Sequence, residues 1–220
     1  MSRSGETPAR VRRSRDAARH AILEAAEKRL KGGGPDAVRV QRVAEDLGIT
    51  DAAVHHHFGS RQGLLEALLR FAGARLREEL GGILERWNGK PAGVRRVAEL
   101  IADTYSEQGY ARLALFLTEA GWESRGSGMF SPLVDAVHRR RVEAARDRGA
   151  PRPRREESQY EVALLNLALA AEPLMSRDFL RAVGVAGAAQ DRARFRRWLV
   201  RRLTRMLTAG TACCAAAVQR

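Results

Sequence analysis

The chain has 220 residues, 45% of them hydrophobic, which is enough to bury the core of one large domain or two small ones. Its 39 Lys and Arg residues against 26 Asp and Glu give a net charge of +13, which favours a polyanionic partner such as nucleic acid. No stretch approaches the roughly 20 apolar residues of a membrane span, and residues 1–15 lack the apolar run of a signal peptide. We therefore expect a soluble, cytoplasmic protein without membrane contact.

The N-terminal segment is polar and basic. Residues 1–13 carry several arginines and show no apolar periodicity, which predicts a flexible basic arm. From Ser14 apolar residues recur at helical spacing until the three glycines at 32–34, which predicts the first helix.

Two short helices follow. One is predicted over 39–47 and ends at Gly48, and the next is predicted over 51–57 with Thr50 as its N-cap. Gly59 ends the latter and Ser60 caps the helix that follows. Further helices are predicted over 61–87, 91–109, 110–122, 131–149, 156–175 and 189–208, with Pro173 ending or kinking one of them.

No strand alternation, glycine-rich phosphate loop or internal repeat occurs, so the sequence predicts an all-α protein. The two short helices joined through Gly48 indicate a helix-turn-helix, a unit that places its second helix in the major groove of DNA. We expect four segments: an arm over 1–13, a DNA-binding domain over 14–60, a larger helical domain over 61–208, and a flexible tail over 209–220.

Residues 40–69, "VQRVAEDLGITDAAVHHHFGSRQGLLEALL", resemble the DNA-binding segment of the tetracycline-repressor (TetR) family. His57 and Phe58 match the family's His-Phe pair, whereas His55 and His56 stand where the family usually has two tyrosines. The resemblance implies a three-helix DNA-binding domain followed by a variable helical domain that binds an effector and forms dimers.

The resemblance also implies particular DNA contacts. Arg61 matches the family's phosphate-contacting lysine, Gln41 stands where a side chain often reaches a base, and Thr50 where a hydroxyl approaches the DNA backbone. The small Ala52 lets the recognition helix approach closely, and Asp51 serves either as a cap or as a base contact. The complete predicted set is Arg10, Arg12, Arg13, Gln41, Thr50, Asp51, Ala52, His55, His56 and Arg61.

The three consecutive histidines do not suggest a metal site. Neighbouring helical residues point about 100° apart, and the pair at i and i+4 that a helical zinc site requires is absent. The adjacent Cys213 and Cys214 suggest neither a disulfide framework nor a zinc site. We therefore expect no bound metal, no cofactor and no catalytic residue.

In the larger domain, four aromatic residues are candidates for an effector pocket or for plain core: Trp87, Tyr105, Phe116 and Trp122. The last two predicted helices suit a four-helix bundle between two chains. The predicted interface consists of Val162, Leu165, Asn166, Leu169, Leu199 and Leu203, and Asn166 could instead bond a ligand.

These features together predict a homodimeric, effector-responsive repressor of transcription that binds a palindromic operator in double-stranded DNA. Two alternatives remain open at this stage. One is an all-α enzyme with an incidental helix pair, and the other is a nucleoid-type protein that coats DNA without sequence preference.

Overall fold

The computed structural model describes residues 8–88, 90–123 and 128–208, and for residues 8–14 it describes the backbone alone. Within these residues every regular element is a helix, as the sequence predicted. The elements are α1 (Pro8–Gly33), the short 3-10 helix η1 (Pro35–Ala37), α2 (Val40–Leu47), α3 (Asp51–Phe58), α4 (Arg61–Glu85), α5 (Pro91–Ser106), α6 (Tyr110–Glu119), α7 (Ser131–Asp147), α8 (Arg155–Ala182) and α9 (Ala189–Thr208). No described helix is long and apolar enough to cross a membrane.

The helices form two compact units. The first comprises the chain up to Ala72 together with Gln108–Trp122, and the second comprises Gly73–Glu107 and the chain from Glu123 onward. The boundary therefore divides α4, whose first half belongs to one unit and whose second half belongs to the other.

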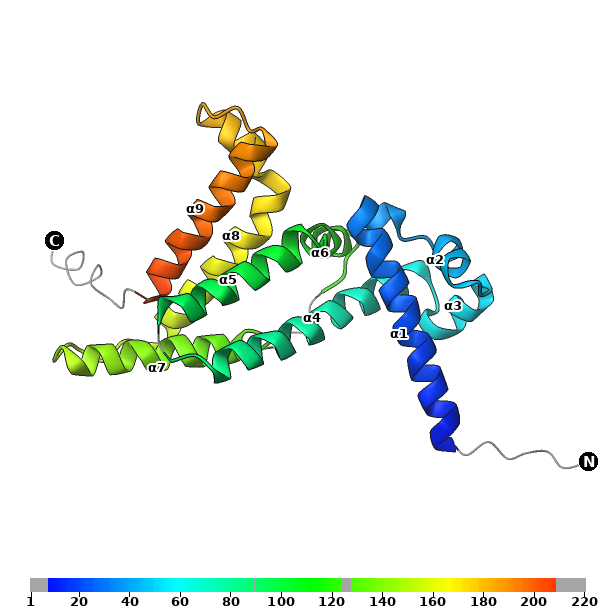
Figure 1. Ribbon diagram of the computed structural model, residues 1–220, viewed down its shortest axis with the longest axis horizontal. Helices are drawn as coiled ribbons and strands as arrows, with labels where there is room; N and C mark the ends of the chain where they lie inside the picture. Colours follow the sequence, from blue (N-terminus) through cyan, green and yellow to red (C-terminus); the bar gives the residue numbers. More distant parts are fainter. Residues whose placement is uncertain (1–7, 89, 124–127, 209–220) are drawn as a thin grey trace, which may run out of the picture. The chain divides into compact units, whose positions relative to one another are not determined.

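In the first unit α1 lies along the short helices α2 and α3, as Figure 1 shows. Its core is apolar and draws on every helix of the unit; fully buried members are Ile22, Leu30, Val43, Ala44, Val54, Leu64, Leu65, Leu68, Tyr110, Leu113 and Leu117. The structure thus adds the first half of α4 and all of α6 to the helices that the sequence assigned to the DNA-binding domain. These two segments belong to the first unit because Leu64, Leu68 and Leu113 complete a core that α1, α2 and α3 leave open.

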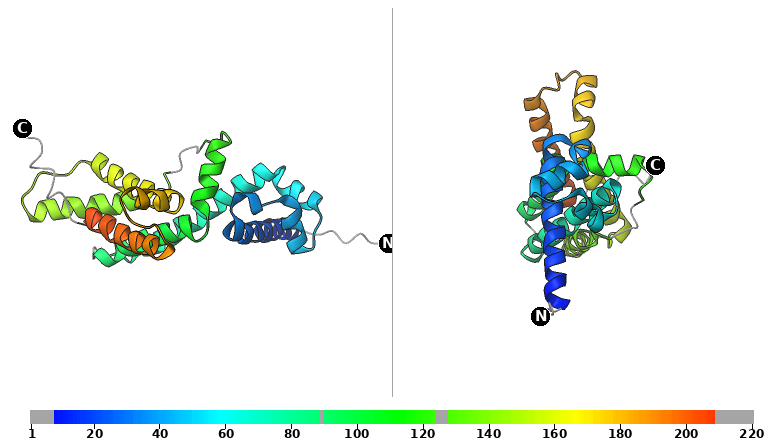
Figure 2. Two further views of the ribbon diagram at one scale, coloured as in Figure 1. Left: turned by 90° about the horizontal axis from the view of Figure 1, so that it is seen from above. Right: turned by 90° about the vertical axis from the view of Figure 1, so that its right-hand side faces the viewer.

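The second unit is a bundle in which α5 packs against both α8 and α9. Figures 1 and 2 show α8 and α9 side by side as an antiparallel hairpin, with α7 against α8. The core of this unit is built mainly from Leu, Val and Ile of the facing helices, including Val97, Ile101, Leu133, Leu165 and Leu169.

Two helix boundaries differ from the sequence prediction. The helix α1 begins at Pro8 instead of Ser14, because proline suits the first helical position and no helix breaker follows it. Residues 8–13 are therefore helical, and residues 1–7 lie outside the described part of the chain. The helix α8, predicted over 156–175, continues to Ala182, so Pro173 lies inside the helix and does not end it. Proline removes one N–H group, but burial of Ser176 and Leu180 beyond it keeps the last turns packed.

Candidate nucleic-acid interface

A tight turn joins α2 to α3. Gly48 adopts φ 63° and ψ 32°, a left-handed conformation that favours glycine, and its N–H returns to the carbonyl of Glu45 at 3.2 Å. Val43, Ala44 and Val54 are buried beneath the turn. The two short helices are thus fixed against α1 by apolar contacts, and their other faces stay exposed.

The N-terminus of α3 is capped as predicted. The Thr50 hydroxyl accepts a hydrogen bond from the N–H of Ala53 at 3.3 Å, which satisfies one of the free donors of the first turn. Asp51 occupies the first helical position, where its negative charge interacts favourably with the positive end of the helix dipole. Ala52 and His55 are exposed on the same helix. The outer face of α3 therefore combines a methyl group with an imidazole, both within reach of an approaching molecule.

His55 has a defined hydrogen-bonding state. Its Nδ1 lies 3.0 Å from the carbonyl oxygen of Gly59, and a carbonyl can only accept, so Nδ1 carries the proton. In the neutral ring Nε2 is then an acceptor, which repels a phosphate oxygen. Protonation turns Nε2 into a donor, so a phosphate contact from His55 requires the charged form.

An arginine of α1 holds the C-terminal end of α3. Arg19 Nη1 donates to the carbonyl oxygen of His57 at 3.0 Å, and its guanidinium lies 4.5 Å from the centre of the Phe58 ring. Sequence reasoning missed this residue, because an arginine on the polar side of a helix carries no signal of its long-range partner.

His57 itself is partly buried, whereas the neighbouring His55 and His56 are exposed. Burial lowers the pKa of His57, and the positive charges of His56, Arg15 and Arg19 lower it further. The surroundings of α3 are thus positively charged, which suits an anionic partner.

Arg61, which was predicted to contact a DNA phosphate, forms hydrogen bonds within its own chain. Its Nε donates to the carbonyl of Val38 at 2.8 Å and its Nη2 donates to the carbonyl of Pro35 at 2.6 Å. The guanidinium also lies 5.4 Å from the centre of the Phe116 ring. Arg61 therefore ties α4 to the segment before α2, because it bonds the carbonyl of Pro35, in η1, and the carbonyl of Val38, directly after η1.

The junction between α3 and α4 depends on a glycine. The Ser60 hydroxyl accepts from the N–H of Gly63 at 3.0 Å and caps α4. A Cβ at Gly63 would lie 2.1 Å from the carbonyl oxygen of Phe58, so no larger residue fits. This close approach sets the direction in which α4 leaves the recognition helix.

Most of the predicted DNA-contacting residues lie together on one part of the first unit. Gln41, Thr50, Ala52, His55 and His56 are exposed on α2, α3 and the turn between them, and Asp51 is partly buried. The side chains of Arg10, Arg12 and Arg13 lie outside the described part of the chain. Among the described residues no group of three His, Cys, Asp or Glu side chains could hold a metal ion.

The four predicted effector-binding residues divide between the units. Phe116 and Trp122 pack on the core of the first unit, whereas Trp87 and Tyr105 pack on the core of the second. The Tyr105 hydroxyl donates to Asn166 Oδ1 at 3.5 Å, and burial raises the pKa of Tyr105 to about 12. Asn166 Nδ2 in turn donates to the carbonyl of Val162 at 2.9 Å, so this amide forms a hydrogen bond within its own helix.

The predicted dimer-interface leucines and valine face the wrong way for an interface. Val162, Leu165, Leu169 and Leu203 are between 0% and 5% exposed inside the core of the second unit, and Leu199 packs against that core. The helix α8 is apolar on two faces, and the residue pattern could not show which face turns inward.

A short helix with an exposed polar face, fixed across a tight turn to a second helix in a positively charged setting, defines a helix-turn-helix DNA-binding domain on an all-helical body. Residues 22–68 match the family model described as "Bacterial regulatory proteins, tetR family". The first unit of the chain therefore carries a TetR-type helix-turn-helix DNA-binding domain.

Relatives and solved structures are similar to the chain. The HTH-type transcriptional regulator BetI of Brucella suis biovar 1 (strain 1330) is 28% identical over 102 residues, which is 46% of this chain. The match spans only half the length of BetI.

Two crystal structures share the fold at low sequence identity. A TetR-family regulator from Pectobacterium atrosepticum is 21% identical with a TM-score of 0.59, covering 93% of this chain and 97% of its own. The regulator AibR, in complex with isovaleryl coenzyme A and operator DNA, is 14% identical with a TM-score of 0.52, covering 88% of this chain and 99% of its own.

Proposed function

We propose that the protein is a homodimeric, effector-responsive repressor that binds a palindromic DNA operator. The exposed face of α3 carries the proposal, because Ala52, His55 and His56 lie outward while Val54 is fully buried behind them. A helix held in this way can enter the major groove without rearrangement of its own domain.

Selection of bound fragments from a random DNA library, followed by footprinting, tests operator binding. A bounded palindromic footprint is the expected result, and uniform coating would instead support a nucleoid-type protein. Gln41→Ala and His56→Ala are expected to weaken operator binding, whereas Glu24→Ala on α1 serves as an exposed control.

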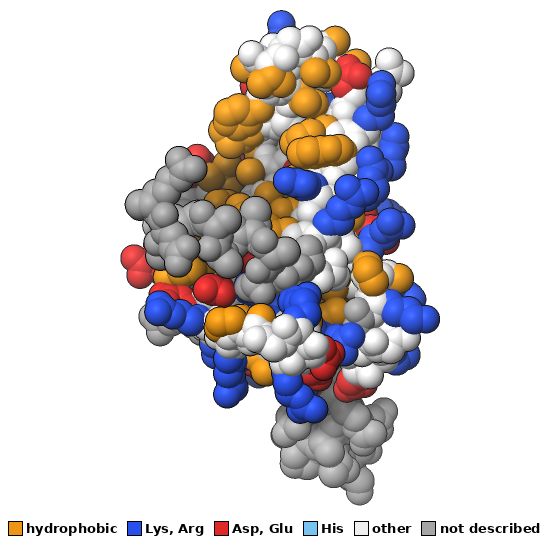
Figure 3. Space-filling view, turned by 90° about the vertical axis from the view of Figure 1, so that its left-hand side faces the viewer, with side chains coloured by type: hydrophobic (Ala, Val, Ile, Leu, Met, Phe, Trp, Pro, Cys, Tyr) orange, Lys and Arg blue, Asp and Glu red, His pale blue; other side chains and the backbone are white. Residues whose placement is uncertain are grey.

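Exposed apolar side chains support the dimer. Eight of the ten large hydrophobic residues that the described chain exposes lie between Tyr160 and Trp198, and Figure 3 shows hydrophobic side chains in the upper part of the view, over α8 and α9. Along α8 and its C-cap these exposed side chains form a stripe: Tyr160, Leu164, Leu167, Met175, Phe179 and Val183. Leu167 in this stripe points away from the buried Leu165. Isologous pairing of two copies would cover the stripe.

Light scattering of the free protein tests the interface. Leu167→Glu and Phe179→Glu, which place a charge on the exposed stripe, are expected to convert a dimer into a monomer. Leu115→Glu is the control, since this leucine is 46% exposed on the first unit and lies off the stripe. A wild-type monomer at micromolar concentration would contradict the proposed dimer.

The Tyr105–Asn166 pair supports an effector site inside the second unit. Its hydrogen bond of 3.5 Å is long, so a ligand that bonds either group more closely would lose little in replacing it. The solved complex of AibR with isovaleryl coenzyme A and operator DNA adds support that a protein of this fold can bind both a small molecule and DNA.

The helix α4 is the proposed link between effector and operator, because it contributes Leu68 to the first core and Leu76 and Leu80 to the second. A ligand that moves α4 would change the spacing of the two recognition helices. An effector found by thermal-shift screening should therefore bind more weakly to the operator complex than to the free protein. Equal affinity for both forms would exclude this coupling.

A further inference from the structure

A concave site lies in the second unit where α4 ends and α5 begins. The cavity has a volume of about 270 Å³ and is lined by Ile83, Arg86, Trp87, Asn88, Lys90, Ala92, Gly93 and Arg96. This volume lies just below the usual range for small-molecule pockets, and the exposed side chains at its rim leave it open to solvent. It therefore suits a small ligand that stays partly in water.

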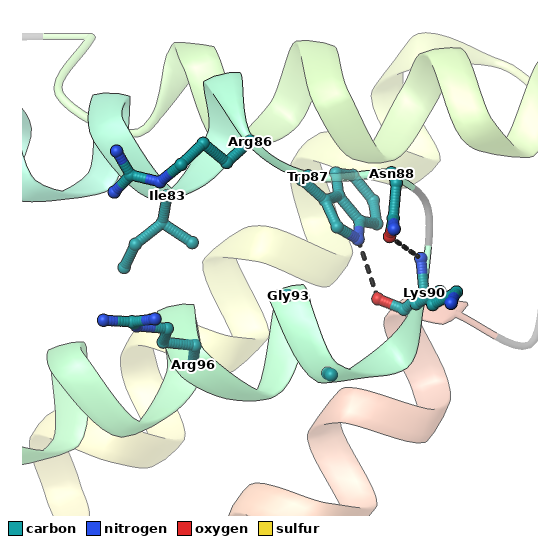
Figure 4. A pocket seen from close by; sticks show the side chains of 8 residues that line it. Ile83, Arg86, Trp87, Asn88, Lys90, Gly93 and Arg96 are labelled. Carbon is teal, nitrogen blue, oxygen red and sulfur yellow. Dashed lines mark hydrogen bonds between the residues drawn. The ribbon is translucent and has the colours of Figure 1, made fainter.

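All the charged side chains that line the site are positive. Arg86, Lys90 and Arg96 line it, no acidic residue does, and within the described part of the chain none of the three forms an ion pair. Arginines elsewhere in the chain do form such pairs, for example Arg70 with Glu66. Figure 4 shows the guanidinium groups of Arg86 and Arg96 on either side of Ile83, at one end of the pocket. Two like charges held there repel each other, and a bound anion would remove that repulsion.

The other end of the pocket is aromatic and held in place. The Trp87 indole N–H donates to the carbonyl of Lys90 at 2.8 Å, as Figure 4 shows. A Cβ at Gly93 would lie 2.2 Å from Trp87 Cδ1, so the indole packs directly on the backbone of α5. Trp87 also packs in part on the core of the second unit. These contacts fix the ring, so a ligand can use it without the cost of ordering it.

We propose that this pocket binds a nucleoside phosphate, with the phosphate between Arg86 and Arg96 and the planar base toward Trp87. Each guanidinium presents parallel N–H groups that match phosphate oxygens, and two cations balance the double charge of a phosphate monoester. The base gains stacking or edge contact with the indole, and Ile83 supplies apolar surface beside the two arginines.

The inference is independent of operator binding. None of the lining residues lies on α1, α2 or α3, and neither Tyr105 nor Asn166 belongs to the pocket. Failure of the operator experiments would leave the pocket intact, and loss of nucleotide binding would leave the operator experiments unaffected.

Calorimetry on the full chain without DNA, at fixed ionic strength, tests the site. AMP is the probe. Adenosine lacks its phosphate, ribose 5-phosphate lacks its base, and inorganic phosphate lacks both the base and the ribose. We expect AMP to bind at least about tenfold more tightly than any of the three, because each loses a charged hydrogen bond or the ring contact. Absence of AMP binding, or equal binding of inorganic phosphate, would overturn the proposal.

Variants of two adjacent arginines locate the binding. Arg96→Ala is expected to weaken AMP binding by about tenfold to a hundredfold. Arg95→Ala is the matched control, since Arg95 is exposed on the same helix but does not line the pocket. Equal weakening by both substitutions would show a general effect of charge and overturn the site.

The ring contact has its own readout. AMP should change the tryptophan fluorescence of the wild-type protein, and this change should disappear in Trp87→Phe. Because Trp87 packs in part on the core, Arg96→Ala is the second variant that measures loss of binding without altering the core. Coenzyme A, which carries a nucleoside phosphate at one end, distinguishes a free nucleotide from the head of a larger ligand. Tighter binding of coenzyme A than of AMP would assign the pocket to the larger ligand and keep the nucleoside phosphate chemistry.

Discussion

The two units of the molecule bury very different side chains. Among its described residues, the core of the first unit is apolar except for the hydroxyl of Tyr110, which donates to Glu27 Oε1 at 2.6 Å. All the buried polar or charged residues of the described chain lie in the second unit: Thr104, Arg141, Ser158, Glu172, Ser176 and Thr204.

Ion pairs therefore hold helices together in the second unit. Arg141 of α7 lies 3.3 Å from Glu157 and 3.4 Å from Glu161, both on α8. Arg196 of α9 contacts Glu172 of α8 at 3.1 Å. Close-packed apolar side chains fix the relative position of their helices, whereas ion pairs can exchange partners or protons. The difference suggests a rigid unit that reads DNA and a second unit whose helix pairing can respond to a ligand.

The largest effect should come from breaking a buried pair. Arg141 is 5% exposed, so Arg141→Ala leaves Glu157 and Glu161 together without their cation. We expect a loss of about 3–5 kcal/mol in the free energy of unfolding, measured with urea. Arg140→Ala is the control, because this neighbouring arginine is exposed and its pair with Glu143 contributes little. Equal stability of the two variants would remove the contrast between the units.

In the first unit, Arg61 tests whether a polar residue there is structural or DNA-contacting. Arg61→Ala leaves the carbonyls of Val38 and Pro35 without their donor, and we expect a loss of about 2 kcal/mol in stability. Arg42→Ala, on the exposed face of α2, should change stability by less than about 0.5 kcal/mol. A stable Arg61→Ala protein that binds operator weakly would instead support the phosphate contact predicted from the sequence.

The surface of the first unit should respond to pH through its histidines. A histidine beside a DNA phosphate favours its charged form, so its extra affinity is present at low pH and lost as pH rises. We expect operator affinity at fixed salt to fall about tenfold between about pH 6 and pH 8. His55→Gln with His56→Gln should remove most of this dependence, and His20→Gln should not. An unchanged profile in the double variant would place the titrating group elsewhere.

The smallest effect concerns one partly buried histidine in each unit. Burial lowers the pKa of His57 and of His138, and neighbouring positive charges lower each further. Each histidine therefore binds its proton more readily in the unfolded chain than in the folded one. The contribution of the neutral ring to the free energy of unfolding is full above about pH 6.5 and is lost as pH falls toward the lower pKa of the folded state. His57→Gln and His138→Gln should each flatten this decline in urea unfolding at acidic pH. A decline that persists in both variants would assign it to carboxylates.

Local sequence determined most helices and the helix-turn-helix. Gly48, Thr50 and Ser60 act within a few residues of their own position, through a left-handed turn and two N-caps, and the structure confirms each of them. Apolar periodicity likewise located the helices of the second unit to within a few residues at most ends. These features depend on interactions between near neighbours, which a single sequence displays directly.

Tertiary structure alone decided which groups meet across the chain. The sequence shows two apolar faces on α8, and only packing against α5 and α9 shows that Leu165 is inside and Leu167 outside. The charge of Arg61 predicts an anionic partner, and only the position of η1 shows that its side chain also bonds the carbonyl of Pro35. The bond of Arg19 to the end of α3 spans 38 residues, and the pocket at Trp87 requires Gly93 of the following helix. Side-chain type and local spacing set what a residue can do, but the distances that select one of its roles arise only when the helices pack.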